Sequence, residues 1–222
     1  MYFVGFCDKI FSGDIMRLRN VKNKEEIMSQ SDYLIRNPKD YKGKWSELFH
    51  NHHPILIEIG MGKGKFLIEN ALRYPENNYI GIEKYDSVIV KGLQKIKTDI
   101  PNLIMVRADA KEIDLMFDHE VDCIYLNFSD PWPKNRHEDR RLTSLKFLKR
   151  YDNIFKKDKN IIMKTDNRKL FEFSIIEFAN YGYKVIDLNL DLYKDNITDN
   201  VPTEYENKFK ELGPIYKIEV KK

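Results

Sequence analysis

The sequence lacks the features that mark membrane, secreted and metal-dependent proteins. Its 222 residues contain no apolar run near the roughly 20 residues that a membrane-spanning helix needs. The only two cysteines, Cys7 and Cys123, match neither a disulfide framework nor a metal-binding spacing, which favours a reducing, cytoplasmic setting. His50, His52 and His53 have no cysteine or acid at ligand spacing, so no metal site is predicted. The net charge of only +3 does not indicate a nucleic-acid partner by itself.

What is present is a regular alternation of apolar and amphipathic segments from residue 55 onward. A hydrophobic content of 42% is enough for a sizeable core. Strands separated by helical patterns predict βαβ units, and hence an α/β fold with about seven mostly parallel strands and helices on both faces of the sheet. The predicted strands are 55–59, 79–82, 103–106, 121–127, 160–164, 183–188 and 215–220. The predicted helices are 64–73, 86–97, 110–117, 141–156 and 168–180.

The chain divides into three predicted regions. Residues 1–15 are short and apolar, but they lack the basic start and cleavage site of a secretory signal. We therefore interpret them as an upstream or non-native extension, with Met16 as the functional start. Residues 16–54 are polar and form a predicted amino-terminal arm, and residues 55–222 form the main domain.

A glycine-rich run is the strongest local signal. The sequence EIGMGKG begins at Glu58, directly after the apolar run Ile55 to Ile57, and an amphipathic pattern follows it. Glycines at 60, 62 and 64 let the backbone turn sharply and approach a ligand closely. Dinucleotide sites use G-x-G-x-x-G instead, which disfavours an NAD-dependent oxidoreductase. The E-x-G-x-G-x-G pattern resembles motif I of the S-adenosylmethionine-dependent methyltransferases.

An acidic residue also follows three further predicted strands. Glu83 comes 23 residues after Gly60, close to the spacing of a carboxylate that accepts hydrogen bonds from ribose hydroxyls. Asp109 is placed to accept the adenine amino hydrogens or to cap the next helix. Asp130 opens the rigid sequence Asp-Pro-Trp-Pro. Because ligands of open α/β sheets bind beyond the carboxyl ends of the strands, these acids are candidate ligand contacts.

Longer runs resemble one family in particular. The run YLNFSDPWPKNRHEDRRLT around Asp130 is similar to the signature of the bacterial tRNA (guanine-N7)-methyltransferases. So are GKWSELFHNHHPILIEIGMGKGKF around the glycines, KTDN from residue 164 and TEYE from residue 203, and the match extends in order over about residues 16–220. The resemblance implies a Rossmann-like class I methyltransferase, with S-adenosyl-L-methionine as methyl donor and tRNA as substrate. It also implies methylation at N7 of a guanine in the tRNA variable loop.

The resemblance further implies a role for each matching position. Asp130 is the catalytic candidate, and the predicted cofactor contacts are Glu58, Gly60, Gly62, Gly64, Glu83, Asp109 and Asp130. The matching substrate positions are Lys134, Asp166, Thr203, Glu204, Tyr205 and Glu206. We add Arg136, Arg140 and Arg141, because they follow Asp130 in a segment, 134–159, with ten Lys or Arg against four Asp or Glu. The acids Glu138 and Asp139 depart from the more basic family pattern and offer these arginines a partner within the loop.

The implied chemistry agrees with the residues. Guanine N7 carries a lone pair and no proton, so its methylation needs orientation rather than a general base. The base becomes cationic, and a preorganised carboxylate such as Asp130 can stabilise that charge or bond the N1–H and N2–H edge of guanine. The alternatives are a methyltransferase acting on amino groups of adenine or cytosine, a small-molecule methyltransferase, and a non-catalytic RNA-binding module. The sequence leaves the choice between monomer and homodimer open.

Overall fold

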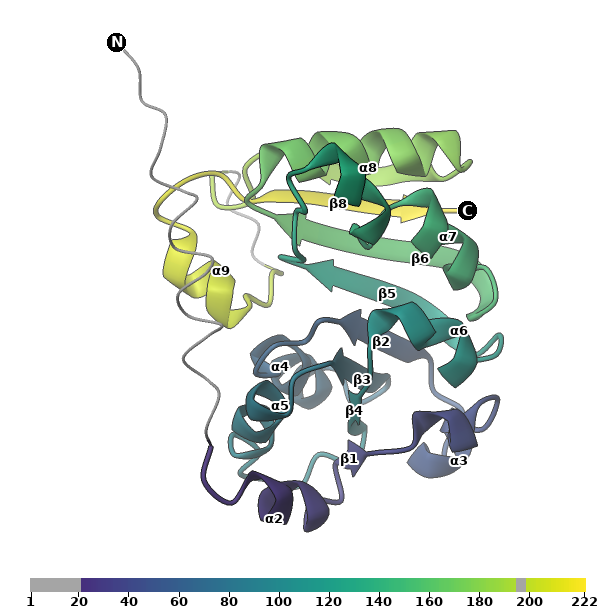
Figure 1. Cartoon of the computed structure of the whole chain (residues 1–222), viewed down its shortest axis with the longest axis vertical. Helices are drawn as coiled ribbons and strands as arrows, with labels where there is room; N and C mark the ends of the chain where they lie inside the picture. The colour runs from purple at the N-terminus through teal and green to yellow at the C-terminus, as the bar shows by residue number, and fades with distance from the viewer. Residues whose placement is uncertain (1–20, 195–198) are drawn as a thin grey trace.

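The computed structural model describes residues 21–194 and 199–222, and within these ranges eight strands form one twisted sheet (Figure 1). The predicted extension 1–15 and the predicted start at Met16 lie outside the described residues. The strand order is β1-β4-β3-β2-β5-β6-β8-β7, and the pairs are parallel except where β8 lies antiparallel to β6 and β7. The strands are β1 (Leu34–Ile35), β2 (Ile55–Ile59), β3 (Asn78–Glu83), β4 (Leu103–Arg107), β5 (Val121–Asn127), β6 (Phe155–Thr165), β7 (Lys184–Asn189) and β8 (Tyr216–Lys221). The predicted mostly parallel α/β fold is thus confirmed, with one strand more than expected.

The hydrophobic core is split by the sheet into two clusters. On β3, Ile80 and Ile82 belong to one cluster and Tyr79 to the other, because successive side chains of a strand point to opposite faces. The first cluster includes side chains of α3 (Trp45–Phe49), α6 (Ile113–Met116), α7 (Leu145–Tyr151) and α8 (Arg168–Asn180). The second includes side chains of α2 (Lys24–Ser29), α4 (Lys65–Arg73) and α5 (Asp86–Leu93). Helices therefore cover both faces, and none in the described ranges is long and apolar enough to cross a membrane.

The described part of the predicted amino-terminal arm is built into this core. Strand β1 pairs with β4 and extends the sheet by one strand. After the short 3-10 helix η1 (Pro38–Tyr41), Trp45 is fully buried, and its indole N–H donates to the carbonyl of Met116 at 2.8 Å. Its ring stacks on Phe117 with 5.1 Å between centroids. Residues 21–54 thus contribute to the packing of the domain.

Three predicted helices are wrong in extent. The predicted helix 86–97 is α5, which ends four residues early, at Leu93. The predicted helix 141–156 is only α7, since Phe155 already pairs with Val121 of β5. Strand pairing with β5 outweighs the local helical pattern of the residues from Phe155 onward. The predicted helix 110–117 is a 3-10 turn, η2 (Ala110–Glu112), followed by α6. A further helix, α9 (Glu204–Phe209), was not predicted, because six residues are too few for a periodic pattern.

Gly81, in the middle of β3, lets the strand pack closely against Met61 of the glycine-rich run and Leu67 of α4. A Cβ atom at this position would lie 2.3 Å from Sδ of Met61 and 2.4 Å from Cδ1 of Leu67, and both neighbours are buried. We expect Gly81→Ala to lower the free energy of unfolding by about 1–3 kcal/mol through overpacking. Urea denaturation measures this loss. Gly213→Ala is the control, because its Cβ meets nothing within 4 Å, and equal midpoints for both variants would contradict the packing argument.

Candidate active site

The glycine-rich run turns sharply between β2 and α4. Gly60, Gly62 and Gly64 have φ angles of 81°, 57° and 71°, in the left-handed region that side chains with a Cβ atom seldom adopt. At Gly60 and Gly62 an added Cβ would meet nothing within 4 Å, so backbone conformation rather than space requires glycine there. The backbone N–H groups of Gly60 and Met61 donate to the carbonyl of Ile82, which fixes the turn against β3.

Glu58, near the end of β2, is a buried carboxylate with one unsatisfied oxygen. It is 2% exposed, and its Oε1 accepts a hydrogen bond from Nδ2 of Asn127 at 2.8 Å. Its Oε2 has no hydrogen-bond partner among the described residues. Burial raises the pKa of Glu58 to about 7, although the Asn127 hydrogen bond and the charge of Lys164 act in the opposite direction. A buried carboxylate of this kind is suited to a cationic ligand group.

Glu83, at the end of β3, binds the glycine loop. Its Oε2 accepts from the backbone N–H of Gly62 at 3.2 Å, and its Oε1 accepts from the N–H groups of Lys84 and Tyr85. Burial raises the pKa of Glu83 despite these bonds. The contact with Gly62 places the predicted ribose-binding carboxylate directly beside the glycine turn.

Asp109 follows β4 and holds the turn after that strand. Its Oδ1 accepts from the backbone N–H of Lys111 and caps η2, while its Oδ2 accepts from Nζ of Lys84 at 2.8 Å. Burial acts to raise the pKa of Asp109, but these bonds from Lys84 and Lys111 lower it overall. The capping role that the sequence left open is therefore present, and it leaves part of the carboxylate at the surface.

The Asp130 turn follows β5 and has an unusual backbone. Phe128 and Trp132, which flank it, have φ angles of 51° and 41°, a conformation that costs energy in residues other than glycine. Arg141 stabilises the turn, because its guanidinium donates hydrogen bonds to the carbonyls of Pro131 and Trp132 at 3.0 and 3.1 Å. Partial burial raises the pKa of Asp130. The side chain of Arg141, predicted to contact substrate, is thus occupied in holding this loop.

The other predicted basic residues lie on the outer side of the turn. Arg140 places its guanidinium 5.0 Å from the ring centre of Trp132, and His137 packs edge-on against the same ring. Lys134, Arg136 and Arg140 are exposed. In the described part of the chain Arg136 and Arg140 form no ion pair with a carboxylate, and Asp139 pairs with Lys146 instead. These arginines are therefore not neutralised by the acids of their own loop.

Helix α9 closes the other side of the site. Thr203 and Glu206 form a capping box at its start, and Glu206 is fully buried. Oε2 of Glu206 accepts from Nζ of Lys164 at 2.6 Å, and its Oε1 accepts from Tyr193 and Asn200. Glu206, predicted to contact substrate, thus holds α9 on the end of β6.

Glu204 and Tyr205, which precede Glu206 in α9, are half-buried and make further contacts. The hydroxyl of Tyr205 donates to Oδ2 of Asp166 at 2.9 Å, so two predicted substrate positions bond each other. Glu204 forms ion pairs with Lys95 of the 94–102 segment and with Lys63 of the glycine loop. Lys65 donates to the carbonyl of Pro202 at 3.1 Å. Helix α9 is therefore tied to the glycine loop on one side and to β6 on the other.

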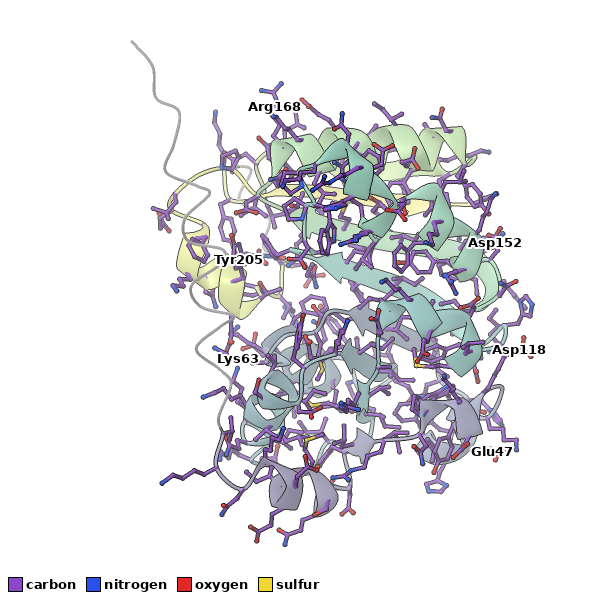
Figure 2. The ribbon with its side chains drawn as sticks, in the orientation of Figure 1. Glu47, Lys63, Asp118, Asp152, Arg168 and Tyr205 are labelled. Atoms are coloured by element: carbon purple, nitrogen blue, oxygen red, sulfur yellow. The ribbon has the colours of Figure 1, made fainter. Side chains whose placement is uncertain are left out.

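A cavity of about 400 Å³ opens between these elements. Figure 1 shows α9 beyond the carboxyl ends of β5 and β6, and Figure 2 shows Lys63 and Tyr205 on this same side of the molecule. Seven of the predicted residues line it, namely Glu58, Gly60, Gly62, Asp130, Thr203, Glu204 and Tyr205. The structure thus brings the glycine loop, the Asp130 turn and the 203–206 segment together. The remaining predicted residues, among them Glu83 and Asp109, are not part of its lining.

The sequence analysis assigned no role to Asn127 or Lys164 and did not predict helix α9. Asn127 lines the cavity beside Glu58, and its register partner on β6 is Lys164. Lys164 is 3% exposed, a rare state for lysine, and a lysine within the apolar run of β6 was the available signal. The Thr-x-x-Glu spacing of the capping box was a signal for α9. Asn127 lies within the matched run around Asp130, but its contact with Glu58 could not be predicted, because it depends on the register between β2 and β5.

Solved structures share this fold. An antibiotic-related methyltransferase matches with a TM-score of 0.61 at 17% sequence identity, covering 83% of this chain and 94% of that protein. The 16S rRNA methyltransferase KamB matches with a TM-score of 0.59 at 12% identity, covering 81% and 92%. At such low identity these likenesses establish the class I methyltransferase fold and no more.

Sequence relatives are much closer. A family model described as "Putative methyltransferase" matches residues 52–218. The tRNA (guanine-N(7)-)-methyltransferase of Geobacillus sp. (strain WCH70) is 49% identical, with 93% of this chain and 96% of the relative covered. The enzymes of the same name from Lachnoclostridium phytofermentans and Bacillus subtilis are each 47% identical, covering 91% and 92% of this chain. The chain therefore belongs to the tRNA (guanine-N(7)-)-methyltransferase family.

Proposed function

We propose that this protein transfers a methyl group from S-adenosyl-L-methionine to N7 of a guanine in tRNA, giving N7-methylguanosine. The observation that carries the proposal is the cavity that the glycine turn, the buried Glu58 and Asp130 line together. The relatives named above support guanine N7 as the target atom. Incubating the protein with bulk tRNA and methyl-labelled cofactor, followed by nucleoside analysis, tests it. Label in N6-methyladenosine, or in no nucleoside, would overturn it.

The residues present fit the cofactor. Its sulfonium supplies an activated methyl group, and the ammonium of its amino-acid part is a cation that suits the carboxylate of Glu58. In this proposal Glu83 binds the ribose hydroxyls, and Asp109 contacts the base through the part of its carboxylate that remains at the surface. The turn at Gly60, Gly62 and Gly64 lets the backbone approach the ligand.

Asp130 is the proposed catalytic residue. It lines the same cavity as the glycine loop, at a turn whose backbone is held by Arg141. A fixed carboxylate costs no reorganisation when positive charge develops on guanine, which is why preorganisation lowers the barrier. The same carboxylate can accept hydrogen bonds from the guanine N1–H and N2–H edge and so select guanine over adenine. Partial desolvation raises the pKa of Asp130, although the residue as a whole is exposed and so is accessible to a substrate.

The proposed substrate side consists of the exposed cations that follow Asp130 and of the segment at the start of α9. We propose that Lys134, Arg136 and Arg140 contact tRNA phosphates and that Thr203, Glu204 and Tyr205, with Asp166, contact the target nucleotide. Glu206 and Arg141 support these positions from behind. Trp132, with Arg140 5.0 Å from its ring centre, offers a flat surface on which a splayed base can stack.

We expect Arg136→Ala and Arg140→Ala to weaken tRNA binding with a shallower salt dependence. Each lost phosphate contact lowers the slope of log affinity against log salt by about 0.7–0.9. Filter binding over a series of salt concentrations measures the slope, and cofactor affinity should be unchanged. Lys157→Ala is the control, because this exposed cation lies near the start of β6, at the opposite end of the strand from the cavity. A lower slope for the control alone would place the RNA-binding surface at that end.

A further inference from the structure

Three aromatic rings in contact with one another line the cavity that Asp130 also lines. They belong to Phe128 of the Asp130 turn and to Tyr205 and Phe209 of α9, and all three residues are half-buried. The ring centre of Tyr205 lies 4.9 Å from that of Phe128 and 4.3 Å from that of Phe209. None of the three belongs to either hydrophobic core cluster of the described residues. Core packing therefore does not account for this aromatic wall.

Phe128 is held in the aromatic wall by a strained backbone. Its φ angle of 51° lies in the left-handed region, and its backbone N–H donates to the carbonyl of Lys164 at 2.8 Å, which fixes that conformation. Strained residues persist where the surrounding structure determines them, and they cluster at ligand sites. Glycine would adopt this conformation without strain, so a phenylalanine here points to a use for its ring.

The other two rings of the aromatic wall already have polar partners. The hydroxyl of Tyr205 donates to Asp166 at 2.9 Å, which fixes the direction of its ring. The ammonium of Lys208 lies 5.3 Å from the ring centre of Phe209, so a cation of the protein occupies that ring. Phe128 is the ring that shares a turn with Asp130, and Tyr205 supports it from α9.

An aromatic ring and a carboxylate that line one cavity suit a flat, positively charged ligand. The face of an aromatic ring carries partial negative charge, which attracts a cation and also stacks on a planar base. Guanine is planar and neutral before methylation and cationic after it. A ring stacked on the base therefore interacts more strongly as the charge develops. Interactions that strengthen in this way lower the barrier, because they favour the transition state over the bound substrate.

We propose that Phe128 is a substrate-binding residue on whose ring the target guanine stacks, and that the ring stabilises the positive charge that the base gains. This inference rests on the proposed function and deepens its substrate side. In the transfer, the N7 lone pair bonds the methyl carbon as the methyl–sulfur bond breaks. The electron pair of that bond stays on sulfur, no proton moves, and the positive charge passes to the base. Phe128 thus acts on the same charge as Asp130, through its ring face.

Binding of two forms of one tRNA tests the assignment. One form is unmodified, and the other carries N7-methylguanine at the position that the parent enzyme methylates. Filter binding is measured with saturating S-adenosylhomocysteine, at a pH at which the methylated base keeps its N1 proton. We expect the parent to bind the methylated form about threefold or more tightly, and Phe128→Leu to reduce that preference by about three- to tenfold. Phe128→Tyr, which keeps the ring, should retain it. Equal weakening of both forms by Phe128→Leu would overturn the proposal.

The reaction rate and the affinity for cofactor give a second comparison. Phe128→Leu should lower the single-turnover rate by about three- to thirtyfold, and Phe128→Tyr should stay within about twofold of the parent. Affinities for S-adenosylmethionine and S-adenosylhomocysteine should change by the same factor in Phe128→Leu. A loss confined to S-adenosylmethionine would assign the ring to the sulfonium and overturn the proposal. Phe128→Met replaces the leucine variant if thermal melting shows that the latter does not fold.

Trp132 is the matched control for Phe128. It flanks Asp130 on the other side and also has a positive φ angle, 41°, but it is not part of the cavity lining. Trp132→Leu should leave the preference for methylated tRNA unchanged. If it removes that preference and Phe128→Leu does not, the base stacks outside the cavity and the proposal is wrong. A parent that methylates no guanine in tRNA would overturn the proposed function, whereas one that methylates guanine N7 but shows no preference overturns this inference alone.

Discussion

Replacing Asp130 with alanine is expected to lower the rate of methyl transfer to tRNA by about 100- to 1000-fold, the usual effect of removing one preorganised electrostatic group. Asp130 is the acid in the cavity wall at the Asp-Pro-Trp-Pro turn, and its backbone is held by Arg141. The affinity for tRNA should remain close to that of the parent, because it depends mainly on phosphate contacts elsewhere. Single-turnover rates with saturating cofactor and tRNA measure the chemical step separately from binding.

Two further variants show which property of Asp130 matters. Asp130→Asn keeps the shape of the side chain and removes its charge, so a loss as large as that of Asp130→Ala assigns the role to charge. Asp139→Ala is the matched control, since Asp139 is an exposed acid of the same loop that pairs with Lys146 and does not line the cavity. A near-parental rate for Asp130→Ala would remove this residue from the mechanism.

The fold was largely predictable because the signals that specify it are local. Apolar runs such as Ile55–Ile59 and Val121–Asn127 are parallel strands with the predicted bounds, and the predicted helix 168–180 is α8. A buried parallel strand must be apolar on both faces, which makes it visible in a single sequence. The acids at the strand ends follow from the same rule, because the ends of parallel strands meet at one edge of the sheet.

The parts that were missed depend on contacts between distant segments. Strand β1 has only two residues and exists because it pairs with Met105 and Val106 of β4. In the sequence, the start of β6 looks like a continuation of the helical pattern of α7. In the structure, Phe155 pairs with Val121 and belongs to the sheet. Helix α9 is held by the buried pair of Glu206 and Lys164, which are 42 residues apart.

The same limit applies to the candidate site. Arg140 and Arg141 are adjacent in sequence and were predicted to act alike, yet one lies over Trp132 and the other bonds two backbone carbonyls beneath it. A sequence gives the charge of such residues, but the direction of each side chain is set by the conformation of the turn. Likewise, the pairing of Glu58 with Asn127 depends on the register of β2 and β5, where Glu58 lies beside Tyr125.

Glu58→Gln is expected to have opposite effects on stability and on ligand binding. The pKa of Glu58 is about 7 in the folded protein, above the ordinary value of 4.5. Between these two values the unfolded chain has already lost the proton that the folded protein keeps, so this group makes stability fall as pH rises from 4.5 to 7. Above pH 7 the cost is complete and on the order of 3 kcal/mol. Glutamine carries no charge and avoids that cost.

The variant should therefore melt at a higher temperature than the parent at pH 8, while the difference should shrink towards pH 5. Subtracting the melting temperature of the parent from that of the variant cancels the titration of groups that both proteins share. The charges of Lys164 and Glu83 contribute to the pKa of Glu58 itself and are part of its effect. Thermal melts across this pH range provide the measurement, and a difference that does not change with pH would show that Glu58 is not the group responsible.

Ligand binding should move in the other direction. Loss of the charge should weaken binding of S-adenosylhomocysteine by about ten- to hundredfold at pH 8, where the parent carboxylate is ionised. The parent should itself bind more weakly as pH falls below about 7, because a protonated Glu58 no longer attracts the ligand ammonium. Calorimetry at pH 6 and pH 8 tests both statements. A variant that is more stable and yet binds as well as the parent would mean that the buried charge is not retained for the cofactor, and Glu58 would then need another explanation.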